Sequence, residues 1–234
     1  MTLQAYTDST CATAAATNLS GTLTVNAVNG VSTFPSISYT VAGQMYIKAT
    51  SGILTSACTP LYTVTPGAAS KLVFRSQPSS TGVAGNTLVD QPLVEIQDAN
   101  SNRVTTATDA VNLAAYSDAA CTVASTGTFG ATTNPVTAAS GQAGFTGVNH
   151  TKAESIYIKA TSGTLTSACS SVVAIAAGPA SRLAFSTQPS TAATEICTTL
   201  ATQPAVRVED AFGNTVTSYT TPISLAAASN SSCS

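Results

Sequence analysis

The sequence predicts an all-β protein built from tandem copies of one sandwich domain, and three observations support this prediction. Blocks of sequence recur at a spacing close to 111 residues. Short β-prone runs alternate with turn residues along the whole chain of 234 residues. No window combines the apolar period of an amphipathic helix with capping residues at its ends. The chain is long enough for one large domain or two ordinary ones.

The internal repeat is visible in several separate blocks. Residues 157–163 (YIKATSG) restate residues 46–52, and residues 181–185 restate residues 70–74 with two changes, both at an offset of 111. The block that begins at Gln203 restates the block that begins at Gln91 at an offset of 112. Because independent blocks agree within a residue, the chain contains a repeated structural unit.

Two stretches rich in small residues, proline and glycine indicate the domain boundaries. Residues 65–69 (TPGAA) and 177–180 (AGPA) occupy matching positions, and such stretches commonly link domains. With these boundaries the chain contains the back part of one repeat (residues 1–65), a complete repeat (66–177) and the front part of another (178–234). An alternative division of the repeats places the boundaries before Leu3 and Leu113, and it is less favoured because these boundaries would fall inside expected strands.

The complete repeat contains about seven expected strands. They include residues 71–74, 92–97, 111–116, 144–148 and 155–160 and the run 165–175, with a tight turn at 98–102 and a hairpin turn at 161–163. About seven strands in roughly 111 residues is the spacing of an immunoglobulin-like (Ig-like) β-sandwich. The 40 Thr and 29 Ser residues suit outer strand faces, because the branched Cβ of threonine fits a pleated surface.

The low charge excludes several classes of function. Charged residues make up 8% of the chain and the net charge is −2. Eight scattered Lys and Arg residues cannot form a basic stripe, so we expect no nucleic-acid partner. No apolar run is long enough to span a membrane as a helix, and the first residues lack the basic start and apolar core of a signal peptide. We therefore expect no membrane insertion in this segment.

Six cysteines carry the clearest chemical information. The repeat superposes Cys11 and Cys58, which lie 47 residues apart, on Cys121 and Cys169, which lie 48 residues apart. We therefore predict one disulfide per repeat, Cys11–Cys58 and Cys121–Cys169. Zinc is disfavoured because there is no C-x-x-C spacing and a single histidine. Paired cysteines indicate an oxidising compartment, which is the cell surface, the periplasm or the medium.

The two remaining cysteines have no assigned partner. Cys233 matches Cys11 and Cys121, and its expected partner would lie beyond the last residue, whereas Cys197 lies on a one-residue insertion. Cys197 and Cys233 could bond each other. Alternatively, Cys233 could bond a residue like Cys58 in a continuing chain or a neighbouring molecule.

The turn after the second expected strand resembles a known bacterial pattern. Residues 94–104 (VEIQDANSNRV) and, more closely, residues 208–216 (VEDAFGNTV) resemble the V-x-D-x-x-G-N-x-V turn of Ig-like repeats of the invasin/intimin type. Residues 138–145 resemble that family's T-x-A-x-G-x-A segment, and residues 71–78 are similar to tandem repeats of very large bacterial surface proteins. The resemblance implies Ig-like repeats that form stalks or fibres. The paired cysteines and the low charge depart from the family.

Candidate catalytic and metal-binding residues are few. His150 is the single histidine and occupies the position of Tyr39 in the first repeat, so we expect an exposed strand or loop residue rather than a catalytic base. Four Asp and Asn side chains in the turns have two interpretations. They could bind calcium at a domain junction, or they could make hydrogen bonds within their own turns, and we favour the hydrogen bonds. These residues are Asp98, Asn102, Asp210 and Asn214. We expect no enzyme activity, no metal and no cofactor.

The incomplete repeats at the two ends indicate how copies could assemble. The part missing from the last repeat corresponds to residues 12–65, which the first repeat carries. The front part of one molecule would complete the back part of the next, which is a head-to-tail contact that resembles strand addition. The same lengths also fit a segment of a longer array.

The first interpretation is a structural segment of an exported bacterial surface fibre, stalk or adhesin, in which domains act in series. Its expected partners are copies of itself or adjacent repeats of a longer chain. The alternative is an adhesive module whose loops recognise a host glycan or protein. Aromatic anchors are typical of binding loops, and the candidates are Tyr39, Tyr116 and Tyr219.

Overall fold

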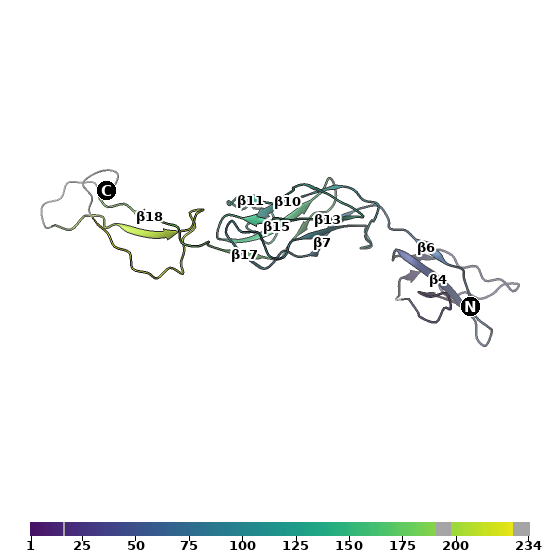
Figure 1. Ribbon diagram of the computed structural model, residues 1–234. Coiled ribbons are helices and arrows are strands. Elements are labelled where there is room, and N and C mark those ends of the chain that lie inside the picture. Colours follow the sequence, from purple (N-terminus) through teal and green to yellow (C-terminus); the bar gives the residue numbers. More distant parts are fainter. Residues whose placement is uncertain (16, 191–197, 227–234) are drawn as a thin grey trace.

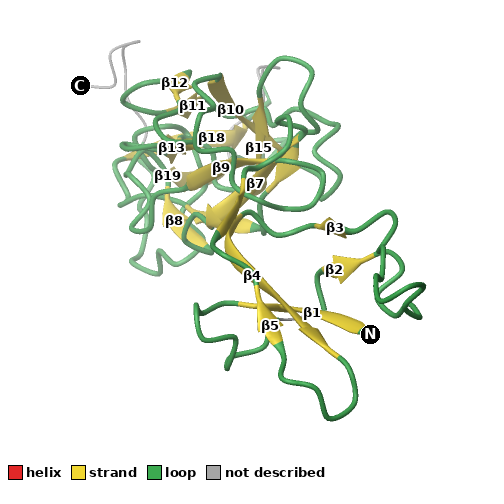
Figure 2. Cartoon of the chain, turned by 90° about the vertical axis from the view of Figure 1, so that its right-hand side faces the viewer, coloured by secondary structure: helices red, strands yellow, loops and turns green. Residues whose placement is uncertain are grey.

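The computed structural model describes residues 1–15, 17–190 and 198–226, and every regular element in these ranges is a β-strand (Figure 2). The all-β prediction is therefore confirmed for the described part of the chain. No helix capable of crossing a membrane occurs among these residues. We call residues 1–65, 66–177 and 178–226 the N-terminal, middle and C-terminal segments, and they follow one another in a row (Figure 1). Their limits as domain boundaries remain a prediction.

The middle segment contains two packed sheets. The larger sheet has the order β12-β10-β15-β17-β8, with β16 also paired to β15, and the smaller sheet has the order β13-β9-β7. A separate pair joins β11 to β14. The strands are β7 (Lys71–Ser76), β8 (Thr81–Val83), β9 (Leu93–Gln97), β10 (Ala110–Tyr116), β11 (Phe129–Gly130), β12 (Val136–Thr137), β13 (Gln142–Gly144), β14 (Asn149–His150), β15 (Ser155–Thr161), β16 (Ala168–Cys169) and β17 (Val173–Ala176).

The hydrophobic core of the middle segment lies between these sheets. β10 and β15 alternate buried and less buried residues, as expected for strands with one face toward a core. Leu113 and Ile158 from the larger sheet and Leu72 and Ile96 from the smaller sheet belong to one buried cluster. Two sheets that share one core are consistent with the predicted sandwich.

The N-terminal segment repeats one layer of this arrangement. Its strands are β1 (Thr2–Tyr6), β2 (Leu19–Ser20), β3 (Ser38–Tyr39), β4 (Gly43–Thr50), β5 (Ala57–Cys58) and β6 (Tyr62–Val64). β4 pairs antiparallel with β1, β5 and β6, and β2 pairs with β3. β1 and β4 place Tyr6 opposite Tyr46, and β10 and β15 place Tyr116 opposite Tyr157. The two segments therefore use the same strand register.

The C-terminal segment repeats part of the other layer. Its two strands, β18 (Arg182–Thr187) and β19 (Ala205–Glu209), form an antiparallel pair with an irregularity after Phe185. β7 and β9 pair in the same way, with an irregularity after Phe74. In the middle segment β13 adds a third strand to this pair, whereas β18 and β19 form a two-stranded sheet within the described residues.

One predicted strand is wrong and one predicted run is divided. Residues 144–148 do not form a strand, because β13 ends at Gly144 and β14 begins at Asn149. Gly147 lies between them with a φ of 66°, a left-handed conformation that interrupts an extended chain. The run 165–175 contains β16 and β17 rather than one continuous strand.

Candidate functional site

The first junction between segments is formed by the side chain of Asn102. This residue belongs to the turn that follows β9 in the middle segment, and it contacts the loop before β4 in the N-terminal segment. Asn102 Nδ2 donates to the carbonyl oxygen of Thr40 at 2.8 Å, and Asn102 Oδ1 accepts from the amide of Ala42 at 2.8 Å. A single amide side chain thus satisfies two backbone groups of the neighbouring segment.

Asp98 holds Asn102 in position and also binds the linker. Its Oδ2 accepts from the Gly67 amide at 2.8 Å and from Asn102 Nδ2 at 2.9 Å. Its Oδ1 accepts from the amides of Asn100 at 2.9 Å and Asn102 at 2.8 Å. Asp98 is only 2% exposed. A buried carboxylate is stable when hydrogen-bond donors surround it, as they do here.

The donors around Asp98 determine its charge state. Burial raises the pKa of this carboxyl, but hydrogen bonds from Asn102, Gly67 and Asn100 outweigh burial and hold the pKa below its usual value. Asp98 is therefore charged at neutral pH. Its four acceptor positions are used by N–H groups, which favours the turn interpretation of this residue over a calcium ligand.

The second junction repeats these contacts with different residues. Asn214 Nδ2 donates to the Thr151 carbonyl at 2.8 Å, and its Oδ1 accepts from the Ala153 amide at 2.8 Å. Asp210 Oδ2 accepts from the Gly178 amide at 2.8 Å and from Asn214 Nδ2 at 2.8 Å. Asp210 Oδ1 accepts from the amides of Phe212 and Asn214, each at 2.9 Å. The same six hydrogen bonds therefore occur at both junctions.

The electrostatics of Asp210 match those of Asp98. Burial raises the pKa of the Asp210 carboxyl, but hydrogen bonds from Asn214, Gly178 and Phe212 outweigh burial and hold the pKa below its usual value. Asp210 is 1% exposed. Both junctions thus contain one buried, charged and fully hydrogen-bonded aspartate.

Phe212 adds an apolar contact to the second junction. Its ring packs directly on the backbone of Gly85 in the middle segment, where a Cβ atom would clash with the ring. Gly85 also has a φ of 79°, so glycine is required there for its conformation as well as for space. The position that matches Phe212 in the first junction is Asn100, a polar residue.

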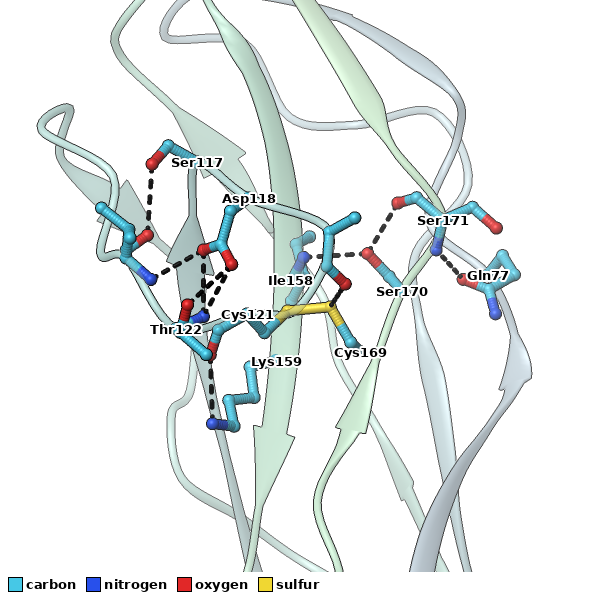
Figure 3. Close-up of a disulfide and its surroundings, with 12 residues drawn as sticks. Gln77, Ser117, Asp118, Cys121, Thr122, Ile158, Lys159, Cys169, Ser170 and Ser171 are labelled. Atoms are coloured by element: carbon cyan, nitrogen blue, oxygen red, sulfur yellow. Dashed lines mark hydrogen bonds between the residues drawn. A yellow bond between two sulfur atoms is a disulfide. The ribbon is translucent and has the colours of Figure 1, made fainter.

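The disulfides form a second feature that recurs in two segments. The structure joins Cys121 to Cys169 and Cys11 to Cys58. Figure 3 shows the Cys121–Cys169 bridge between the loop after β10 and strand β16. Each bridge links two parts of the chain on either side of the central strand of its sheet, β15 or β4. Cys197 and Cys233 lie outside the described residues, so their two alternative pairings stay open.

Polar contacts around each disulfide are also repeated. Lys159 Nζ donates to the Cys121 carbonyl at 3.1 Å and lies 5.3 Å from the centre of the Tyr116 ring (Figure 3 shows the hydrogen bond). Lys48 Nζ makes the same hydrogen bond to Cys11 at 3.2 Å and lies 5.3 Å from the Tyr6 ring centre. These distances are typical of a cation over an aromatic face.

Aspartates order the loops that lead into the disulfides. The amide of Val123 and the hydroxyl and amide of Thr122 donate to Asp118 and lower the pKa of its carboxyl. Asp8 accepts from the hydroxyl of Thr10 and the amides of Thr13 and Ala12, and these hydrogen bonds lower its pKa well below the usual value. Cys11 and Cys121 follow with positive φ values of 51° and 53°.

The prediction that His150 is exposed is wrong. His150 is 1% exposed, and its Nε2 lies 2.9 Å from Glu154 Oε1. Glu154 Oε2 in turn lies 3.0 Å from Lys152 Nζ. The residue is buried because β14 pairs with β11 and Gly127, which has no side chain, leaves space against the ring. Burial raises the pKa of Glu154, but hydrogen bonds from His150 and Lys152 outweigh it and lower the pKa.

The tyrosines predicted as binding anchors are not brought together. Tyr39 lies on β3, Tyr116 on β10 and Tyr219 beyond β19, so each belongs to a different segment. Across the described ranges there is no group of three or more His, Cys, Asp or Glu side chains that could hold a metal ion.

The sequence did not reveal which residues of the preceding segment contact the Asn side chain at each junction. Thr40, Ala42, Thr151 and Ala153 contribute backbone atoms, which leave no pattern in side-chain identity. The Asp–Asn turn on the other side of each junction left a pattern, because Asp98 and Asn102 recur as Asp210 and Asn214 with the same separation. That recurrence identified the turn but not its contact with the preceding segment.

Comparisons with known proteins do not place the chain in a family. No protein-family model and no curated protein matches it. Among solved structures, a β-glucuronidase from Parabacteroides merdae matches with 14% identity and a TM-score of 0.34, covering 57% of this chain and 16% of the enzyme. A β-glycosidase from Bacteroides vulgatus matches with 8% identity and a TM-score of 0.33, covering 64% of this chain and 19% of the enzyme. The chain thus spans less than a fifth of either enzyme, and these TM-scores support no functional inference.

Proposed function

We propose that this chain is a structural segment of an exported bacterial surface fibre, stalk or adhesin. Its units are disulfide-braced Ig-like repeats of about 111 residues, divided at residues 65 and 177 and similar to those of the invasin/intimin type. The single observation that carries the proposal is the pair of matching junctions. Repetition of one contact between successive neighbours is expected of a fibre whose domains act in series.

The physical basis is the cost of separating the segments at a junction. The hydrogen bonds that cross the junction join the neutral amide of Asn102 to two backbone groups, and such bonds contribute about 0.5–1.5 kcal/mol each. Asp98 binds both the linker at Gly67 and the side chain of Asn102, which reaches the N-terminal segment. Bending at this junction therefore breaks the two hydrogen bonds that Asn102 makes to the N-terminal segment, whereas the bonds to Asp98 lie within the middle segment and hold the Asn102 side chain in position.

The disulfides support the proposed location. Disulfides persist in oxidising compartments, and two of them recur at matching positions in this chain. An extracellular or cell-surface location fits these bridges. Domains braced in this way also resist unfolding, because the crosslink limits the conformations of the unfolded chain.

Small-angle X-ray scattering of the full chain tests the proposal. We expect the wild-type chain to scatter as a stiff rod, and the double variant Asn102→Ala/Asn214→Ala to show a shorter average maximum dimension and the profile of hinged segments. Asn100→Ala is the matched control, because its exposed side chain lies in the same turn and only its backbone amide binds Asp98. A wild-type chain that already scatters as hinged segments would contradict the proposal, as would a double variant identical to wild type.

A further inference from the structure

The second junction contains a buried histidine that the first junction lacks. His150 is 1% exposed and is the last residue of β14, directly before the loop of residues 151–154 that contacts the C-terminal segment. β11, which pairs with β14, lies toward the β18 end of the middle segment (Figure 1). A buried histidine beside an interface is a side chain through which pH can change the geometry of that interface.

Hydrogen bonds link His150 to both contacts of the second junction. Its carbonyl oxygen accepts from the Gly85 amide at 2.9 Å, and Gly85 is the residue on which the Phe212 ring packs. The carbonyl of the next residue, Thr151, accepts from Asn214 Nδ2 at 2.8 Å. A displacement of His150 therefore moves the groups that hold the C-terminal segment through its apolar contact and through its polar contact.

The partner of His150 determines which ring nitrogen carries the proton at neutral pH. Burial raises the pKa of Glu154, but hydrogen bonds from His150 and Lys152 outweigh burial and hold the pKa below its usual value, so the carboxyl is charged. A carboxylate only accepts hydrogen bonds, and Nε2 of His150 lies 2.9 Å from Oε1 of Glu154. Nε2 therefore donates, and Nδ1 is the unprotonated nitrogen of the neutral ring.

The other ring nitrogen is buried without a partner. Nδ1 of His150 is enclosed and has no hydrogen-bond partner among the described residues. A proton added to Nδ1 would leave a buried N–H donor without an acceptor, which is unfavourable. Glu154 attracts the added charge, but Lys152 Nζ lies 3.0 Å from the second oxygen of Glu154 and opposes it. The closed arrangement therefore fits the neutral ring.

The remaining surroundings of the ring contribute no charge. Glu154 and Lys152 are the charged groups that face His150 from the described residues, and both belong to the loop after β14. From the other sides the residue is packed by β11 at Phe129, by the loop before β11 at Gly127, and by the turn after β8. None of these parts offers a carboxylate that would pair with a proton on Nδ1.

The first junction has different residues at the same positions. The loop that Asn102 contacts carries Tyr39, Val41 and Gly43 where the second junction has its histidine, lysine and glutamate. The two junctions thus share the Asp–Asn turn and the backbone groups that it binds. They differ in whether the contacted loop contains a histidine.

We infer that the second junction loosens when His150 takes up a proton, between about pH 8 and pH 5, whereas the first junction does not respond over this range. The inference rests on the proposed function, because it assigns a regulation to a junction that carries that function. An open junction lets Nδ1 reach water and so binds the proton more tightly than the closed one, and a lower pH therefore favours the open form. Asp98 and Asp210 keep their charge over this range, since the pKa of each lies below 3.8 in the folded chain.

Nuclear magnetic resonance of the full chain tests this inference without any substitution. The chain has a single histidine, so its imidazole nitrogen signals report the tautomer and the protonation of that ring directly. We expect the Nε2–H tautomer at the upper end of the pH range and proton uptake toward the lower end.

Amide protection in the same titration reports the two junctions separately. The amides of Ala153 and Gly85 belong to the second junction, and the amide of Ala42 belongs to the first. We expect the protection factors of Ala153 and Gly85 to fall about tenfold as the ring is protonated, because a buried donor without an acceptor has a cost of that size. The protection factor of Ala42 should not change. Protection factors are compared rather than rates, because the intrinsic exchange rate itself depends on pH.

A glutamine substitution separates the charge of the ring from its hydrogen bond. The side-chain amide of His150→Gln can donate to Glu154 but does not titrate, so the protection of Ala153 should be the same at both ends of the pH range. Tyr39→Phe, at the matching position of the N-terminal segment, is the control and should keep the response of the wild-type chain. If His150→Gln does not fold, the titration of the wild-type chain decides alone.

Several outcomes would overturn the inference. They are a histidine that stays neutral across the range, proton uptake without any change at Ala153 and Gly85, an equal loss of protection at Ala42, and a pH response that persists in a folded His150→Gln chain. The proposed function is tested by scattering of the asparagine variants at neutral pH. A stiff chain without this pH response would therefore overturn the inference and leave the proposed function standing.

Discussion

The N-terminal and middle segments have the same strand pairing but different cores. β1 and β4 pair over five residues with the register that β10 and β15 use. In the middle segment these strands face a second sheet and bury twenty residues in one cluster, whereas Ala5, Leu19 and Met45 are the buried cluster of the N-terminal segment. Both segments also carry the same disulfide and the same lysine above a tyrosine ring.

This difference separates what local pairing determines from what a closed core determines. Register follows from hydrogen bonding between neighbouring strands and from the alternation of side chains, so one layer is enough to define it. Burial of the apolar face requires the other layer, because a single sheet leaves that face in water. We therefore expect the N-terminal segment to depend more strongly on its crosslink than the middle segment does.

Removal of the disulfides is expected to give the largest effect. Closing a loop of 47 or 48 residues contributes about 4 kcal/mol on the chain-entropy model. We expect Cys121→Ser/Cys169→Ser to leave the middle segment folded but less stable by this amount. The double variant Cys11→Ser/Cys58→Ser should instead abolish amide protection in β1 and β4, as measured by hydrogen exchange. Retained protection in β4 would show that one layer is stable without its bridge.

Truncation at matching core positions is expected to give the next largest effect. Ile158→Ala removes a fully buried side chain and should lower the unfolding free energy of the middle segment by about 3 kcal/mol. Ile47→Ala removes a half-buried side chain and should cost about 1 kcal/mol in the N-terminal segment. Urea denaturation followed by hydrogen exchange of β15 and β4 measures the two separately. Equal losses at Ile158 and Ile47 would contradict the expected difference between the closed core and the single layer.

Acidification is expected to open both junctions in a similar way. The pKa of Asp98 and of Asp210 lies below the ordinary value of 3.8 in the folded chain. Their stabilisation is therefore present above that ordinary value and is lost as the pH falls through the lowered one. Protonation weakens the hydrogen bonds that each carboxylate accepts, at a cost of about 2 kcal/mol per junction. Scattering profiles recorded at decreasing pH should change from those of a rod to those of a hinged chain before the middle segment unfolds. If the junctions opened and the middle segment unfolded at the same pH, this order would be contradicted.

Substitution of the two lysines above tyrosine rings is expected to give the smallest effect. Lys159→Met and Lys48→Met keep the aliphatic stem but remove the hydrogen bond to a cysteine carbonyl and the cation above the ring. Each should cost about 1 kcal/mol, and the two losses should be equal because the contacts are local. Thermal denaturation of the two single variants, compared with Lys71→Met on β7, checks this equality. A loss confined to Lys159 would mean that the contact depends on the closed core.

The sequence predicted those features that recur as side-chain patterns. The cysteine pairs, β7, β9, β10 and β15 follow from repeated blocks and alternation, because pairing partners leave the same residues at the same offsets. The buried position of His150 was missed, because the matching Tyr39 lies in a segment without a second sheet and polar type alone suggested exposure. The reach of Asn102 to Thr40 was missed, because its partner atoms belong to the backbone.

The match between the two junctions has a geometric consequence. If the hydrogen bonds that the two junctions share fix the orientation of neighbouring units, the same rotation and translation relate each unit to the next. Any object generated by a constant rotation and translation has screw symmetry, so a longer series of such units would trace a regular helix with a fixed pitch. The Asp–Asn turn would then determine the azimuth at which successive units present their loops, and a single altered turn would reorient every unit beyond it.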